Sequence, residues 1–259
     1  MELDISDILA DVHSASLSPQ DQLASTAHLD HQQLTRLWTS ERTCPDILPW
    51  PTELMQRVMA RVQSQIARIE DLAAGIVPTN MPAHGGSGSG TGTGNQNLNL
   101  TLSILQTDLS RTQFLVRSLL RQRLAKLTKH AAYYLAQLSV AETKETLLSP
   151  AEAEFLRGHQ ALLAGLYGAS FLEAFPAQLR RLDDTAGGVS MVEGPEGKAS
   201  VFVRCLSERW GRSGEGEVEG EDDDDGGGGG GLRMRRGDVW VVRWEDVKKG
   251  VLGGSLELL

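Results

Sequence analysis

The sequence predicts an α+β protein, with a mainly α-helical bundle domain in its N-terminal part and a small β-rich domain at its C-terminus. As far as about residue 185, apolar residues recur every three or four positions, as they do along one face of a helix. Beyond that point, short runs rich in β-branched residues alternate apolar and polar positions, which is typical of strands. We therefore expect a helical domain over residues 19–185 and a β domain over residues 186–259, preceded by a separate segment, residues 1–18.

Two low-complexity segments interrupt these domains. Residues 84–97 are rich in glycine, serine and threonine, the composition of a flexible linker, and they join two predicted helices. Residues 214–231 combine eight acidic residues with a glycine run, so we expect them to be disordered. These eight acids account for most of the formal charge of −9 and leave −1 for the rest of the chain, so the folded part is close to neutral.

Two helices are predicted before the linker. The first, residues 31–43, has one apolar face and ends before a proline. The second opens at Pro51, where the N–H that proline lacks would have no helical partner, and it ends near Gly75. The apolar positions are Leu34, Leu37 and Trp38 in the first helix, and Leu54, Val58, Val62, Ile66, Ile69 and Ala73 in the second.

The segment RTQFLVRSLLRQRLAKLTKH, residues 111–130, is the most informative part of the chain. It carries six basic residues, and no acidic residue occurs between Asp108 and Glu142. Apolar residues recur at helical spacing from Leu105 to Leu138, which predicts one amphipathic helix of more than ~30 residues, about 50 Å long. Because the acidic residues of the chain lie mostly elsewhere, this basic face indicates assembly with other molecules rather than an enclosed catalytic pocket.

A further helix is predicted to begin at Pro150. Residues 149–152, Ser-Pro-Ala-Glu, have the spacing of a capping box with proline at the first helical position. A short helix over residues 176–182 would close the helical domain. One face of the longer helix would consist of Leu156, His159, Leu163, Leu166 and Tyr167.

Strands are predicted for residues 200–206, 239–244 and 255–259, with a Gly-Asp turn signal before the second of them. We expect about four short strands over ~70 residues. Such a module is below the size at which a core alone is comfortably stable. It should therefore lean on a partner or on the helical domain.

No residue set supports catalysis, a cofactor or a metal ion. His28 and His31 share a helical face but lack further ligands, so we interpret them as surface residues. Asp183 and Asp184 are interpreted as a solvated helix end, and Cys44 as a packed or exposed thiol without a partner histidine. We therefore expect a protein that is not an enzyme. The two cysteines favour a reducing compartment, and neither a signal peptide nor a membrane span is expected.

Taken by itself, the basic helix leaves three interpretations open. Its cations could form a solvated face, or pair with acidic patches on partner subunits. They could also contact phosphates, with steep salt dependence, which would make the chain a stand-alone DNA-binding adaptor that uses residues 111–130.

Four segments, taken in order, resemble the GINS family of eukaryotic replication proteins, and the Sld-five-type subunits of fungi in particular. The family's long helix is similar to DLSRTQFLVRSLLRQRLAKLTKH (residues 108–130), and the start of its bundle to LTRLWTSERTCPDILPW (34–50). The next helix of the family is similar to LSPAEAEFLRGHQALLAGLYGASFLEAFP (148–176), and its C-terminal module to RRGDVWVVRWEDVKKGVLGGSLELL (235–259). The resemblance covers most of the chain outside the two low-complexity segments.

The resemblance implies a non-catalytic structural subunit of the GINS heterotetramer, formed with three Psf-type sister subunits in the nucleus. In that family the tetramer joins the MCM ring and its Cdc-forty-five cofactor in the active replicative helicase, for initiation and elongation of DNA replication. The resemblance also favours a protein interface for the basic helix and leaves DNA contact indirect or weak. The interface residues then expected are Arg117, Arg121, Arg123 and Lys126 of the helix, and Trp240, Trp244, Leu256 and Leu258 of the β domain.

The N-terminal segment MELDISDILADV has the pattern of a short amphipathic helix, with apolar residues three and four apart and acidic residues near its start. A polar run, residues 14–25, separates it from the bundle, as in a tethered helix that binds in a groove of another protein. The alternative is packing on its own domain. The segment resembles the DILA peptide by which fungal subunits of this family dock the trimeric Ctf-four replisome hub. The docking residues would be Asp4, Ile5, Asp7, Ile8 and Leu9.

Overall fold

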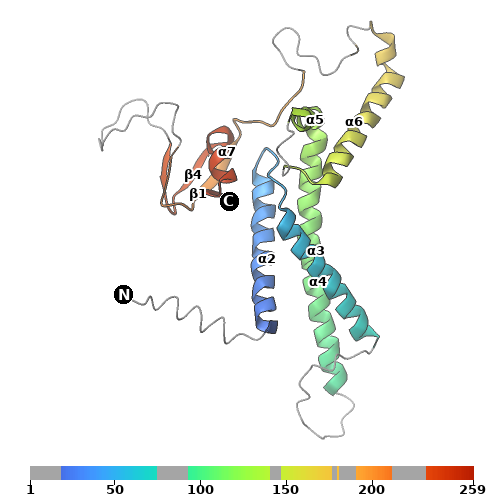
Figure 1. Cartoon of the computed structure of the whole chain (residues 1–259), viewed down its shortest axis with the longest axis vertical. Helices are drawn as coiled ribbons and strands as arrows, with labels where there is room; N and C mark the ends of the chain where they lie inside the picture. Colours follow the sequence, from blue (N-terminus) through green and yellow to red (C-terminus); the bar gives the residue numbers. More distant parts are fainter. Residues whose placement is uncertain (1–18, 75–92, 141–146, 177–179, 181–190, 212–231) are drawn as a thin grey trace, which may run out of the picture. The chain divides into compact units, whose positions relative to one another are not determined.

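The computed structural model describes residues 19–74, 93–140, 147–176, 180, 191–211 and 232–259 (Figure 1). Helices occupy the first part of the chain and short antiparallel strands the last, so the predicted α+β class is confirmed. The predicted docking segment, residues 1–18, and the acidic and glycine-rich segment, residues 214–231, lie outside the described residues. No described helix is both long and apolar enough to cross a membrane.

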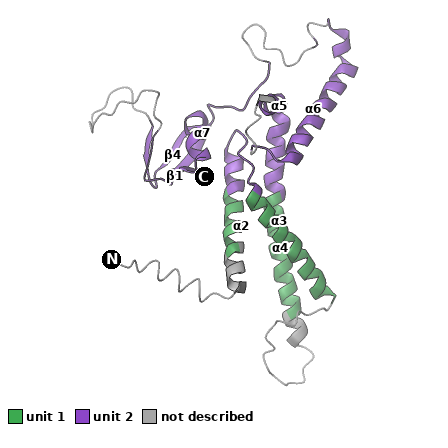
Figure 2. Ribbon diagram, in the orientation of Figure 1, with its two compact units in different colours: residues 1–36, 53–116 green, residues 37–52, 117–259 purple. Residues whose placement is uncertain are grey.

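The chain divides into two compact units (Figure 2). Unit 1 consists of residues 1–36 and 53–116, and unit 2 of residues 37–52 and 117–259. The division falls inside two helices and groups the strands with part of the helical region. Residues 37–52 thus belong with the β domain as well as with the helices that follow.

The helices of unit 1 differ from the predicted ones at their starts. Helix α2 (Pro19–Thr43) begins well before residue 31, so residues 19–25 of the predicted tether are helical. Helix α4 (Thr93–Lys129) begins inside the segment predicted as a linker, because Leu98 and Leu102 continue the helical spacing of Leu105 backwards. Helix α3 (Thr52–Ala73) follows Pro51 as predicted.

Unit 1 is held by apolar packing and by one buried carboxylate. Asp30 is buried, and its two oxygens accept hydrogen bonds from Arg57 at 3.1 Å and Arg61 at 2.7 Å, which ties α2 to α3. Gln65 donates to the carbonyl of Leu105 at 3.0 Å, which ties α3 to α4. The buried apolar side chains include three positions of the predicted α3 stripe: Leu34, Leu54, Met55, Val58, Val62, Leu72 and Leu115.

The central helix is long, as predicted, but it is not continuous. Helix α4 has 37 residues and ends at Lys129, and a separate helix, α5 (Ala131–Val140), follows a turn at His130. The prediction of one helix reaching Leu138 was therefore wrong. At the turn the His130 ring Nδ1 lies 3.0 Å from the carbonyl oxygen of Glu193, so a segment far along the chain contacts the break.

The capping box at the start of helix α6 (Pro150–Ser170) is confirmed. The Glu152 N–H donates to the Ser149 hydroxyl oxygen at 3.2 Å, and the Ser149 N–H donates to the Glu152 carboxylate at 2.9 Å. A 3-10 turn, η1 (Leu172–Ala174), follows. The short helix predicted for residues 176–182 lies mostly outside the described residues, and the described positions 176 and 180 are not helical.

Among the described residues, five short strands form two antiparallel sheets. The three-stranded sheet has the order β4-β1-β5, and the second sheet pairs β2 with β3. A helix that the sequence did not predict, α7, begins at Trp244, so the strand predicted for residues 239–244 ends one residue early. The bounds are β1 (Ser200–Cys205), β2 (Arg209–Gly211), β3 (Arg233–Arg235), β4 (Val239–Arg243), α7 (Trp244–Leu252) and β5 (Leu256–Leu258).

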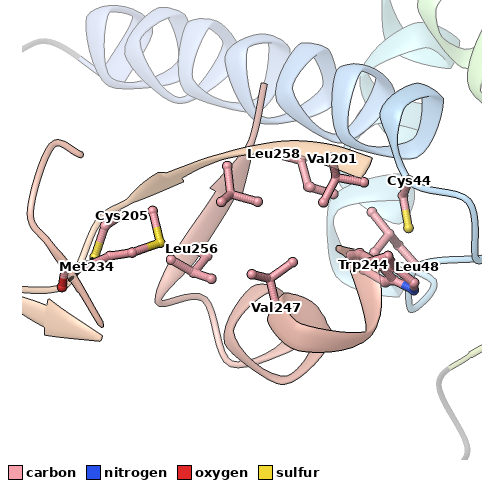
Figure 3. Packing of buried hydrophobic residues seen from close by; sticks show 10 residues of the cluster. Cys44, Leu48, Val201, Cys205, Met234, Trp244, Val247, Leu256 and Leu258 are labelled. Atoms are coloured by element: carbon pink, nitrogen blue, oxygen red, sulfur yellow. Dashed lines mark hydrogen bonds between the residues drawn. The ribbon is translucent and has the colours of Figure 1, made fainter. Parts of the chain in front are cut away.

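The core of the β domain extends into residues 37–52 (Figure 3). Cys44 and Leu48 pack at the end of this core where Trp244 begins α7, so the β domain leans on the helical part of its own unit, as predicted for so small a module. Burial raises the pKa of the Cys44 thiol to about 12, which keeps it protonated near neutral pH. The other buried members are Val201, Val203, Cys205, Met234, Val247, Leu256 and Leu258.

Candidate protein-interaction site

The side chain of Arg123 is completely buried, although it belongs to the basic face predicted as an interface. Its guanidinium makes five hydrogen bonds. Two go to the Glu152 carboxylate at 2.7 and 3.0 Å, and one to Glu41 at 3.2 Å. Two more go to the carbonyls of Leu48 at 2.7 Å and Leu147 at 3.0 Å. All five N–H groups of the guanidinium thus have partners inside the chain.

Burial alone would lower the pKa of Arg123, but the hydrogen bonds and charges of Glu152 and Glu41 outweigh this effect and raise it. The group is therefore charged at all physiological pH values. The central carbon atom (Cζ) of the Arg123 guanidinium also lies 5.2 Å from the centre of the Trp50 ring, within cation–π range. Arg123 thus holds the start of α6, the end of α2 and the loop after it around α4.

Lys126 completes the same cluster. Its ammonium group donates to the Glu41 carboxylate at 2.7 Å, and to the carbonyls of Glu41 at 2.6 Å and Asp46 at 2.8 Å. An ammonium has three donors, so this group is saturated within the chain. Arg123 and Lys126 were predicted to contact partner subunits; within this chain, their anionic partners are Glu41 and Glu152.

Asp46 links this loop to α5 and to the β domain. One oxygen accepts hydrogen bonds from the Tyr134 hydroxyl at 2.9 Å and the Ile47 N–H at 2.8 Å. The other accepts from the Lys248 ammonium at 2.5 Å, and Lys248 lies on α7. Burial, together with the Asp46 charge, raises the pKa of Tyr134. The polar contacts and the apolar core therefore fasten the β domain at the same loop.

The remaining predicted interface residues separate into exposed and buried ones. Arg117, Arg121 and Trp240 are exposed, with Trp240 41% exposed on the edge strand β4, so they stay predictions. Trp244 is 2% exposed and, like Leu256 and Leu258, belongs to the core of the β domain, so these three predicted interface residues are buried within their own chain. The docking residues Asp4, Ile5, Asp7, Ile8 and Leu9 lie outside the described residues.

Helix α6 carries an exposed apolar face that shares only Leu166 with the predicted one. Only its first two turns are buried, at Glu152 and Leu156. Farther along, Leu162 is 76% and Leu166 is 61% exposed, and Phe155 is exposed seven residues before Leu162. The spacing places these three on one helical face. The sequence pattern could have indicated this exposed face, because α6 has apolar residues on two of its faces and a single neighbouring helix can cover only one of them.

Two other surfaces share this character. In unit 1, α4 exposes Leu100, Ile104 and Phe114 at spacings of one face. In unit 2, Phe202 of β1 pairs with Val241 of β4, and both are exposed on the side of the sheet away from the core. Exposed apolar faces of this kind mark sites of protein–protein contact. Among the described residues, no group of three or more histidine, cysteine or acidic side chains could hold a metal ion.

Comparison with known proteins agrees with these observations. Residues 83–171 match a family described as "GINS complex protein helical bundle domain", and residues 195–259 match "DNA replication complex GINS protein SLD5 C-terminus". These matches cover α4 to α6 and the β domain.

Three fungal relatives share the name DNA replication complex GINS protein SLD5. The one from Chaetomium globosum is 34% identical over 99% of this chain and 100% of its own length. The one from Eremothecium gossypii is 33% identical over 78% of this chain and 77% of its length. The one from Schizosaccharomyces pombe is 30% identical over 89% of this chain and 92% of its length. The resemblance seen in the sequence is thereby confirmed, and the chain belongs to the SLD5 family of DNA replication complex GINS proteins.

Proposed function

We propose that this chain is a non-catalytic structural subunit of a nuclear GINS heterotetramer, with three Psf-type sister subunits as its partners. The names of its relatives support a role in a replication complex. The exposed apolar face of α6 is the observation that carries the proposal, because side chains such as Leu162 and Leu166 lose contact with water only when another molecule covers them.

Within such a tetramer the proposed task is to hold larger parts of the replication machinery together. The tetramer would join the MCM ring and its Cdc-forty-five cofactor in the active replicative helicase, and DNA contact by this chain would be indirect or weak. The open face of the three-stranded sheet, around Phe202 and Val241, is a second apolar surface available for such contacts.

The rival function, a stand-alone DNA-binding adaptor, loses support from the buried cluster. Two of the six cations of residues 111–130, Arg123 and Lys126, are saturated by internal acceptors and cannot reach phosphates without breaking those bonds. The remaining four form a thinner basic face than the sequence indicates.

Replacing Leu162 and Leu166 by serine tests the structural proposal. Co-expressed with the three sister subunits, the variant is expected to lose most of its co-purification with them, because each exposed leucine buried at an interface is worth roughly 1.5–3 kcal/mol. Serine at Glu154 and Arg157, exposed positions outside this face, is the matched control and should co-purify normally. Equal co-purification of both variants would remove α6 from the interface and take the main support from the proposal.

We also propose that residues 1–18 dock the trimeric Ctf-four hub as a tethered amphipathic helix. A labelled peptide of these residues should bind the hub saturably, and its variant with Ile8→Ala and Leu9→Ala should not, because the apolar face supplies the groove contacts. Anisotropy titration measures both. Equal binding by the two peptides would contradict the docking proposal and favour the alternative that the segment packs on its own domain.

A further inference from the structure

The hairpin formed by β2 and β3 carries three arginines on one face. Residues alternate between the two faces of a strand, and the burial pattern shows which face is outward: Trp210 and Met234 are turned inward, while Arg209, Arg233 and Arg235 are exposed. In the register, Arg209 stands directly opposite Arg235. Each of the three therefore presents its cation on the same outer surface, which we call the arginine face.

The inward side of the hairpin fixes this orientation. Met234 is buried in the core of the β domain, and Trp210 packs against it. Trp210 also lies so close to α7 that a methyl group placed on Gly250 would come within 2.5 Å of its ring nitrogen. A backbone hydrogen bond from the Arg236 N–H to the Glu208 carbonyl, at 3.2 Å, continues the pairing at the end of the hairpin away from its connecting loop. The packing of Trp210 and Met234 on the core therefore fixes the outward orientation of the arginine face.

The arginines of this face lack the internal partners that Arg123 has. None of the ion pairs between described residues includes Arg209, Arg233 or Arg235. The carboxylate of Asp238, three residues after Arg235, accepts the backbone N–H of Arg235 at 2.9 Å. Like charges directly opposite each other in a sheet are destabilising. An unfavourable pair of like charges that is held in place by the packing behind the hairpin indicates a use for that pair when an anion lies between the cations.

We propose that the arginine face is a docking site for an acidic peptide segment of a partner protein, bound in extended conformation. Arg233 and Arg235 are two residues apart on one strand, so their side chains leave the backbone about 6.6 Å apart. Acidic residues at every second position of an extended peptide have the same spacing. Guanidinium and carboxylate groups can then form charge-assisted, bidentate pairs along the strand.

The geometry favours an acidic peptide over single-stranded nucleic acid. Surfaces that bind single strands combine cations with exposed aromatic rings on which the bases stack. Here the aromatic side chain of the hairpin, Trp210, is turned to the opposite side and packs on the core. The arginine face offers cations that could contact phosphates, but it offers no aromatic ring on which bases could stack.

The chain's own sequence contains a segment of the matching chemistry. Glutamates occupy positions 215, 217, 219 and 221, which is alternation with period two, between β2 and β3. A linked segment has a high effective concentration. A peptide offered from outside should therefore bind more tightly after residues 214–230 are deleted.

The test titrates a fluorescein-labelled peptide of alternating glutamate and threonine, with four glutamates, into the assembled complex that contains the full chain. A peptide of the same composition, with its four glutamates adjacent, controls for charge without the spacing. The alternating peptide should bind saturably, several-fold more tightly than the control, and more tightly still to the complex with residues 214–230 deleted. A single-stranded oligonucleotide of equal charge is titrated in parallel.

Glutamine at Arg209, Arg233 and Arg235 should weaken peptide binding roughly tenfold or more. Glutamine at Lys198, Arg243 and Lys249, three exposed cations of the same domain, removes the same charge and should leave binding nearly unchanged. The melting temperature of the arginine variant should stay equal or rise, since a like-charge pair is relieved. No saturable binding, equal binding of the two peptides, equal loss in both variants, or tighter binding of the oligonucleotide through the same arginines would each overturn the proposal.

Discussion

Two basic regions of this chain look alike in sequence and differ in structure. The central helix α4 and the hairpin of β2 and β3 both concentrate arginines within a few residues, although eight acidic residues lie between β2 and β3 and no acidic residue lies between Asp108 and Glu142. In α4, Arg123 is enclosed and fully hydrogen-bonded, whereas the hairpin arginines lie exposed on one face. The local count of charges therefore does not tell whether a cation supports the fold or is available to a partner.

The difference arises from residues that are distant in sequence. The acidic partners of Arg123 lie 29 residues away, at Glu152, and 82 residues away, at Glu41. Each is a single acid in an unremarkable local sequence, and only the packing of α2 and α6 around α4 brings both to the same guanidinium. The hairpin is too short to enclose its arginines, so they stay on the surface.

The largest expected effect comes from removing the enclosed cation. Arg123→Ala removes the cation shared by two buried carboxylates. Glu152 then keeps a bond from the Ser149 N–H but loses its ion pair, and Glu41 keeps Lys126, so the free energy of unfolding should fall by about 3–5 kcal/mol. Arg121→Ala, at an exposed position two residues earlier, should change it by less than ~0.5 kcal/mol. Urea unfolding of the assembled complex measures both. If the two variants are equally stable, the cluster is not the support of the fold that its geometry indicates.

The sequence predicted what depends on neighbouring residues. The capping box of Ser149 and Glu152 is defined by a four-residue spacing, and the stripe of α3 by a period of 3.6, so both could be read directly. The alternation in residues 200–206 likewise identified β1. These features can be predicted from the sequence because their hydrogen bonds and their periodicity involve residues that are close to one another along the chain.

The sequence could not predict what depends on pairing across the chain. Trp244 was assigned to a strand and an interface, because an apolar run gives no sign of where β4 ends and α7 starts. The internal partners of Lys126 were missed for the same reason as those of Arg123, since its acceptors are carbonyls and a carboxylate of residues 41–46. The exposed face of α6, apart from Leu166, was not predicted, because the residues that bury the other side of the helix at Leu156 come from α4, α5 and the loop after α2.

A smaller effect is expected at the glycine behind the hairpin. In Gly250→Ala, the added methyl group would meet Trp210 at 2.5 Å and Leu256 at 2.7 Å, so α7 or the hairpin must shift. We expect a loss of about 1–3 kcal/mol, the usual range for overpacking. Gly158→Ala, on α6, has open space at the same position and should gain roughly 0.5–1 kcal/mol from helix propensity. Thermal unfolding of the two variants compares them; a stabilised Gly250→Ala protein would show that Trp210 does not hold the arginine face in place.

The smallest expected effect is that of deleting residues 214–230. The hairpin register pairs Gly211 with Arg233, and the deletion would leave four residues, 212, 213, 231 and 232, to connect them. Loops of four residues are common in hairpins, and shortening a loop changes the closing entropy by only about 0.6 kcal/mol for each halving. We therefore expect tetramer assembly to stay intact and the melting temperature to remain equal or rise slightly, as judged by sizing and thermal unfolding. Loss of assembly would mean that this segment supports the fold and that the arginine face lacks the independence from its loop that the packing of Trp210 and Met234 implies.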